Sequence, residues 1–264
     1  MNSVSLFKRT AVGGAILLGS AAFSLGASAA ALTVTFEKPI FGSTSETPSG
    51  WDNIKLSYGG GTVGTSAGRF TGFASKPIDF DLSLLVDFDN GPAVRFAMYC
   101  YDLEQYISGG DAVPYTVDFD GELPRTLNFL GAVNAELNKG KVGDKVDPYA
   151  WLRPGDAMTA AAIQLGIWES LYETNGGWDI TTGIFKAWEL NSDTISSLDK
   201  FFLRLTSNNF TALAPESVIV LRSGSNQDVL TGDPPAQVPE PGSLALVAAA
   251  GLGLMAARRR RAAK

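Results

Sequence analysis

The chain has 264 residues, with 27 acidic and 21 basic side chains, one cysteine and no histidine. Seven of the basic residues and one acidic residue lie in two predicted targeting segments. The body between them keeps 14 basic and 26 acidic residues, a net charge of −12, which argues against nucleic acid or an anionic membrane as its partner. Without histidine there is no Ser-His-Asp or Cys-His catalysis and no histidine-ligated metal. No spacing singles out a carboxylate pair, so we expect no enzyme, no cofactor and no metal site.

Residues 1–29 are predicted to be a secretory signal peptide. Lys8 and Arg9 supply the positive start, an uncharged stretch follows over 11–25, and the Ala-Ser-Ala sequence at 27–29 offers signal peptidase a cleavage site. The alternative is an N-terminal membrane anchor. It is disfavoured because the apolar stretch is shorter than the roughly 20 residues that span a bilayer.

The first half of the body is predicted as β-structure, because short β-branched or alternating runs are separated by Gly, Ser and Pro. The predicted strands cover 32–36, 54–58, 69–74, 82–88, 94–103 and 115–119. Gly59, Gly61 and Gly64 match the spacing of a dinucleotide-binding fingerprint. That fingerprint requires a helix directly afterwards, and here another strand is predicted, so the glycines indicate a hairpin.

Two acidic segments, 87–91 and 118–122, are rich in the oxygen ligands that calcium prefers. Both lack the register of an EF-hand loop and its closing glutamate. Acidic hairpin tips are therefore the default interpretation, and a weak calcium site at the surface is the alternative.

The second half is predicted to be helical, with helices over 127–138, 157–174 and 194–207. Asp156 is a favourable N-cap for the second helix, and the Asn-Gly-Gly sequence at 175–177 is expected to stop it. A strand over 217–222 follows the third helix. We expect one α+β domain over 30–224, mainly antiparallel β in its first half and helical afterwards, and then a polar linker over 225–237.

The C-terminal segment 238–264 has three parts in order: a Pro-Glu-Pro motif, an uncharged stretch over 242–257 and an arginine cluster. The prolines are expected to end the preceding secondary structure. The apolar stretch is expected to form a short helix in the membrane, and the arginines to stay on its cytoplasmic side. The residues of this predicted signal are Pro239, Glu240, Pro241, Arg258, Arg259, Arg260 and Arg261.

This tail resembles the PEP-CTERM sorting signal of Gram-negative, exopolysaccharide-producing bacteria. The resemblance implies that an exosortase-type membrane protease cuts near the Pro-Glu-Pro motif. The protein would be anchored in the inner membrane only transiently, through this tail, and would then reach the cell surface or the extracellular matrix of a biofilm. The alternative is an ordinary single-pass transmembrane helix, which would be unusually short.

Gln164 and Cys100 form the most informative pair of residues in the body. On the second predicted helix, Gln164 shares an apolar face with Ala160, Ala161 and Trp168, so we expect its amide to be buried. A buried amide that finds no partner costs about 1–3 kcal/mol. The small alanines allow a strand to approach closely, and Cys100 lies on such a predicted strand.

The sequences Tyr-Cys-Tyr-Asp at 99–102 and Ile-Gln-Leu-Gly-Ile-Trp at 163–168 resemble the Cys-Gln thioester domains of bacterial surface proteins. In that family, a strand cysteine in an aromatic-Cys-x-Asp context is bonded to the glutamine of a helix reading Thr-Gln-x-Ala-Ile-Trp. Ile163 and Gly166 depart from this pattern. Similar Gln-Leu-Ala-Ile-Trp-Glu helices occur in proteins with PEP-CTERM tails.

The resemblance implies an internal thioester between Cys100 and Gln164, kept from water by Tyr99, Tyr101 and Trp168. Such a protein would attach covalently to an amine-bearing surface or matrix polysaccharide or protein, or would form an internal cross-link, and would spend its acyl group once. Two alternatives stay open. Cys100 and Gln164 can be ordinary core residues, and the protein can be a non-covalent structural or binding component of the matrix.

Overall fold

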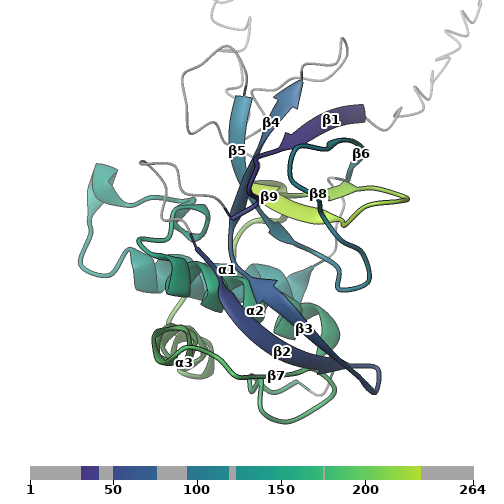
Figure 1. Ribbon diagram of the computed structural model, residues 1–264. Coiled ribbons are helices and arrows are strands. Elements are labelled where there is room, and N and C mark those ends of the chain that lie inside the picture. The colour runs from purple at the N-terminus through teal and green to yellow at the C-terminus, as the bar shows by residue number, and fades with distance from the viewer. Residues whose placement is uncertain (1–30, 42–49, 76–93, 119–122, 175, 233–264) are drawn as a thin grey trace, which may run out of the picture.

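The computed structural model describes residues 31–41, 50–75, 94–118, 123–174 and 176–232 (Figure 1). The strands are β1 Ala31–Phe36, β2 Asp52–Tyr58, β3 Gly61–Ala67, β4 Phe70–Ser75, β5 Val94–Cys100, β6 Ala112–Asp118, β7 Lys186–Trp188, β8 Val218–Arg222 and β9 Val229–Gly232. The α-helices are α1 Pro124–Leu137, α2 Ala157–Tyr172 and α3 Ser192–Thr206.

Six strands form a closed antiparallel barrel in the order β1-β4-β5-β9-β8-β6, and pairing of β6 with β1 closes it. Alternating burial along β6 places Val113, Tyr115 and Val117 on the buried face. By contrast, every residue of β5 after Val94 is buried. Alternation is lost in β5 because both faces of this strand are covered.

A second sheet, in the order β3-β2-β7, lies apart from the barrel beside the helices (Figure 1). Tyr58 pairs with Gly61, so Gly59 and Gly60 form a two-residue turn, and both have positive φ. Positive φ at both central residues is the requirement of the hairpin turn that matches strand twist. The predicted glycine-rich hairpin is therefore confirmed.

The three helices pack against one another, and α2 also contacts β2 and β3. Asp156 caps α2 as predicted, because its carboxylate accepts a hydrogen bond from the backbone N–H of Thr159. The helix ends at Tyr172, before the glycines at 176–177, since Glu173 already has an extended backbone. Pro124 starts α1 earlier than predicted, at a position where its missing N–H costs nothing.

One continuous cluster of buried apolar side chains joins the barrel, the second sheet and the helices. The predicted class is confirmed: a single α+β domain with antiparallel strands first and helices afterwards. Arg69, between β3 and β4, ties the two sheets to the helical layer, because its buried guanidinium donates a 2.7 Å hydrogen bond to the carbonyl of Leu152.

Two boundaries require correction. The strand predicted over 94–103 ends at Cys100, because the next residues turn away and the N–H groups of Glu104 and Gln105 bond to a side chain instead. The segment 225–237 was predicted as a linker, yet Val229–Gly232 is β9, which lies between β5 and β8. A four-residue strand after a polar run carries too little periodicity to be recognised.

The predicted strand over 82–88, the acidic segment at 87–91, the signal peptide at 1–29 and the tail at 238–264 lie outside the described residues. Within the described ranges, no helix is long and apolar enough to cross a bilayer. The same ranges contain no cluster of acidic or cysteine side chains suited to a metal ion, and Asp118 of the second acidic segment pairs with Arg222.

Candidate functional site: the Cys100–Gln164 contact

Cys100 and Gln164 lie in direct contact, although 64 positions separate them in the sequence. Cys100 is the last residue of β5 and pairs with Val229 of β9 at the end of the barrel. Gln164 lies in the middle of α2 and is completely buried, as the apolar face of its helix predicts. The contact therefore joins the barrel to the helical layer.

Two hydrogen bonds hold the Gln164 amide against the Cys100 backbone. The backbone N–H of Cys100 donates to Oε1 of Gln164 at 2.8 Å, and Nε2 of Gln164 donates to the carbonyl of Cys100 at 2.8 Å. The amide thus imitates a neighbouring strand, with its carbonyl and amino group bonded to one residue. This double pairing fixes the amide carbon beside the residue that carries the sulfur.

The Cys100 thiol lies in an apolar environment that favours its neutral form. Only 8 % of the residue is exposed, and burial raises the pKa of the thiol well above its usual range. The nearby carboxylate of Asp102 raises this pKa further, while a hydrogen bond from the side chain of Gln227 lowers it. Cys100 is a free cysteine, and its thiol is protonated at neutral pH.

A cavity of about 290 Å³ reaches Cys100 from the surface. It is enclosed by β3, the start of β4, the loop after β5 and α2. Its lining consists of Ile40, Phe41, Leu56, Val63, Thr65, Ser66, Phe70, Cys100, Leu103, Gln105, Tyr106, Ile107, Trp168 and Gln227. The sulfur-bearing residue is therefore buried in the protein but borders an open space.

Of the three aromatic residues expected to shield the pair, Trp168 lines this cavity together with Cys100. Tyr99 points away from Cys100, as neighbouring strand residues do, and its hydroxyl donates to the carbonyl of Trp151 at 2.9 Å. Tyr101 is half-buried, and the guanidinium of Arg222 lies 4.6 Å from the centre of its ring. Neither tyrosine lines the cavity, so the structure groups Trp168 alone with Cys100 and Gln164.

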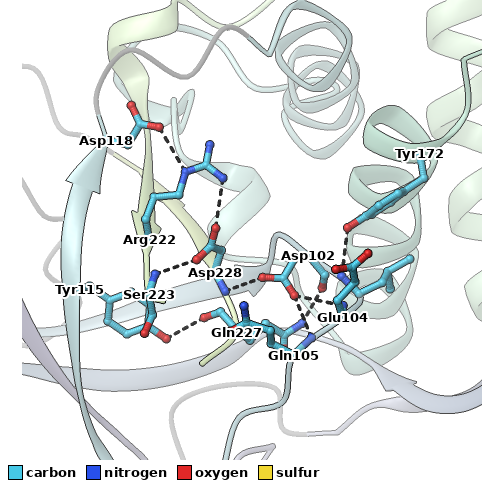
Figure 2. Close-up of polar contacts among 11 residues, drawn as sticks. Asp102, Glu104, Gln105, Tyr115, Asp118, Tyr172, Arg222, Ser223, Gln227 and Asp228 are labelled. Carbon is cyan, nitrogen blue, oxygen red and sulfur yellow. Dashed lines mark hydrogen bonds and ion pairs between the residues drawn. The ribbon is translucent and has the colours of Figure 1, made fainter. Parts of the chain in front are cut away.

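A network of hydrogen bonds positions the turn that follows Cys100 (Figure 2). The Asp102 carboxylate accepts bonds from the backbone N–H groups of Glu104 and Gln105 on one side, and from that of Asp228 at 2.7 Å on the other. Gln227 donates its side-chain N–H to the Asp102 carbonyl at 2.7 Å. The β8–β9 hairpin thereby holds Cys100 in place.

This network explains the aspartate in the Tyr-Cys-Tyr-Asp sequence: Asp102 is a positioning residue. Sequence reasoning missed Gln105 and Gln227, which come from two different loops and line the cavity. Nothing in their local sequence distinguishes them from surface glutamines. Only the pairing of β5 with β9 brings Gln227 to the cysteine, and that strand was not predicted.

The structure explains why glycine, and not the alanine of the thioester-domain pattern, stands at position 166. A Cβ atom built on Gly166 would overlap the ring of Phe129, which packs directly on the backbone of α2. Alanine, the residue of the family pattern, does not fit here without displacing that ring. Ile163, the other departure, is fully buried in the apolar core. Both departures therefore belong to the packing of α2.

Comparisons with known proteins identify one segment of the chain. Residues 237–261 match the family model of the PEP-CTERM protein-sorting motif. The chain has no match among curated proteins or among solved structures. The matched segment coincides with the predicted Pro-Glu-Pro, apolar and arginine parts. The protein is therefore an exported protein with a C-terminal, membrane-associated sorting signal of the kind that an exosortase processes.

Proposed function

We propose that this exported protein carries an internal thioester between Cys100 and Gln164 and uses it to attach covalently to a surface or matrix molecule. The observation behind the proposal is the double hydrogen bond between the Gln164 amide and the Cys100 backbone. It holds the amide carbon against the backbone of the residue that carries the sulfur. Attachment would serve adhesion at the cell surface or in an exopolysaccharide matrix.

The chemistry requires no cofactor. The Cys100 sulfur adds to the amide carbon of Gln164, the carbon–nitrogen bond breaks, and the thiol proton leaves with the nitrogen as ammonia. The backbone N–H of Cys100 already donates to Oε1 of Gln164, so it can stabilise the negative charge that develops on this oxygen during attack. A nucleophile later attacks the same carbon and returns the proton to sulfur. Each acyl group is used once, so the protein is not a turnover enzyme.

The buried environment slows the first step and protects its product. A neutral thiol is a weak nucleophile, so thioester formation is expected to be slow. The thioester carries no charge, however, and a site that disfavours the thiolate does not disfavour the uncharged product. Burial of Cys100, which leaves 8 % of the residue exposed, also limits hydrolysis of the acyl group. The site thus fits a bond that forms once, after folding, and then persists.

The second candidate is a non-covalent structural or binding protein of the matrix. It is favoured by the same two hydrogen bonds, because they already satisfy every backbone group of Cys100 and most of the Gln164 amide. A glutamine that completes the end of a barrel strand has a sufficient structural role. In this case Cys100 remains a small buried apolar residue.

The intact mass of the mature protein separates the two candidates. We expect wild-type protein, kept from amines and from hydrolysing buffer, to be lighter than its sequence by one ammonia. Cys100→Ser is the matched control, since it removes the sulfur and keeps the backbone groups that hold Gln164. The variant should have its full calculated mass and a near-normal melting temperature. A wild-type mass that shows no loss of ammonia contradicts the thioester and leaves the non-covalent role.

A further inference from the structure

The cavity beside Cys100 contains no charged side chain among its described lining residues. Its polar groups are the neutral side chains of Thr65, Ser66, Gln105 and Gln227. Its apolar part includes Phe41, Phe70 and Trp168, and the exposed ring of Tyr106 lies at the rim. An ammonium ion that entered this space would lose water, and the described lining residues offer no carboxylate to replace it. The nearby Asp102 carboxylate is not part of the lining and already accepts three backbone N–H groups. The lining therefore favours uncharged ligands.

Two residues of the lining carry a buried polar atom for which the described part of the chain offers no hydrogen-bond partner. Nε1 of Trp168 is a donor without an acceptor, and the whole residue is only 1 % exposed. Oε1 of Gln105 is an acceptor without a donor. Buried polar groups are paired in nearly all proteins, so unpaired ones on lining residues mark positions where a water molecule or a ligand can bond. One free donor and one free acceptor complement a hydroxyl group, which accepts and donates at once.

We infer that the acyl group of Gln164 is transferred to a hydroxyl of a neutral, sugar-like or polyol ligand that binds in this cavity, and not to a protonated amine. The inference rests on the proposed thioester. The cavity volume of about 290 Å³ lies near the lower end of ligand pockets, which suits one sugar ring or a short polyol. Neutral side chains and an aromatic rim supply hydrogen bonds and an apolar surface for such a ring.

The transfer balances without a further reactant. The ligand oxygen bonds to the Gln164 carbon, the carbon–sulfur bond breaks, and the hydroxyl proton passes to sulfur. The products are an ester on Gln164 and the free Cys100 thiol. Oε1 of Gln105 accepts a hydrogen bond from the incoming hydroxyl and orients it. Because burial raises the pKa of the Cys100 thiol, sulfur takes up the hydroxyl proton as the carbon–sulfur bond breaks, and the product thiol stays neutral.

The test compares two small probes on the mature protein at pH 7: methyl α-glucoside, which has no reducing end, and methylamine. Intact mass should show an adduct with the glucoside, while the methylamine adduct forms at least tenfold more slowly. The rate with methylamine should rise about tenfold per pH unit, because only its small unprotonated fraction enters the cavity. A methylamine adduct that forms readily at pH 7 without any glucoside adduct overturns the inference.

Variants at Gln105 sharpen the test. Gln105→Leu removes the free acceptor and should lower the rate of the glucoside adduct about tenfold. Gln105→Glu supplies the missing carboxylate and should shift the preference towards methylamine. The control is Ser108→Glu, which adds the same charge on the same loop outside the lining and should change neither rate. Equal effects of Gln105→Glu and Ser108→Glu would contradict recognition by the cavity.

A binding measurement separates this inference from the proposed function. In Cys100→Ser, which cannot form a thioester, the indole N–H resonance of Trp168 should shift with methyl α-glucoside and not with methylammonium. Absence of both a shift and an adduct overturns the inference, even where the wild-type mass shows loss of ammonia. A shift without any loss of ammonia supports the neutral-ligand cavity and contradicts the thioester.

Discussion

Two side chains of α2, Gln164 and Glu169, are both completely buried but are held in opposite ways. Both ends of the Gln164 amide are bonded to the backbone of Cys100. The Glu169 carboxylate accepts long contacts through Oε1, at 3.3 Å from the N–H of Asp179 and 3.5 Å from Arg125, and among the described residues its Oε2 has no partner. Burial raises the pKa of Glu169 to about 7. Complete hydrogen bonding fixes the Gln164 amide in place. Incomplete hydrogen bonding leaves the buried Glu169 carboxylate with a pKa of about 7, so that its charge changes near neutral pH.

The largest expected loss of stability comes from Gln164→Glu, which replaces the fully hydrogen-bonded amide by a carboxylate. The new carboxylate would face the Cys100 carbonyl with no donor to replace Nε2, so a buried charge would lack a partner. We expect a loss of about 3–5 kcal/mol in the free energy of unfolding at pH 8, with partial recovery at pH 5, where the acid is neutral. Urea unfolding at both pH values measures this effect.

The matching control is Gln164→Met, which keeps the length of the side chain without a charge. It should cost less than Gln164→Glu at pH 8 and show little pH dependence. An equal loss in both variants at both pH values would mean that shape, and not hydrogen bonding, holds Gln164 against Cys100.

Gly166→Ala tests the packing that positions both side chains on α2. The added methyl would overlap the Phe129 ring, so the ring or the helix must move. Overpacking of this kind costs typically 1–3 kcal/mol, and we expect a value near the upper end. Gly155→Ala is the control, since a Cβ there meets no neighbouring atom. A stable Gly166→Ala protein that keeps its Cys100 chemistry would show that α2 tolerates a shift.

Glu169→Gln replaces the incompletely bonded carboxylate by a neutral amide. Because the folded pKa of Glu169 is raised from 4.5 to about 7, the folded protein binds more protons than the unfolded chain between these values. Stability from this group is complete below pH 4.5 and is lost as pH rises through about 7. The variant should lack this loss and gain on the order of 3 kcal/mol relative to wild type between pH 4.5 and pH 8. Parallel stability curves for the two proteins would contradict the shifted pKa.

The smallest expected effect comes from the N-cap of α2, the helix that carries both Gln164 and Glu169. Asp156→Ala removes the cap on the N–H of Thr159 and should cost about 1 kcal/mol. The loss should be similar in wild type and in Glu169→Gln, because the cap is three turns from Glu169. Coupling between the two changes in a double-mutant cycle would show that the cap also positions the buried groups.

The sequence predicted the features that depend on neighbouring residues. Periodicity and turn residues located six of the nine described strands, the glycine hairpin and the three described α-helices, and the Asp156 cap follows from one residue at the start of its helix. The burial of Gln164 could be predicted because its helical face is apolar. The contact with Cys100 came only from a family resemblance, since pairing across 64 positions leaves no local signal. The cavity and its lining by Gln105 and Gln227 depend on the closing of the barrel, which no segment encodes alone.

The position of β9 determines when the barrel can close during export. It also determines how far the folded domain can lie from the membrane. The barrel closes only when Val229–Gly232 pairs with β5 and β8, so nearly the whole body must be exported before Cys100 is held in its final place. Residues 233–241 separate this strand from the apolar stretch that begins at residue 242. Nine residues span at most about 32 Å. While the tail is in the membrane, the folded domain is therefore held close to the membrane surface.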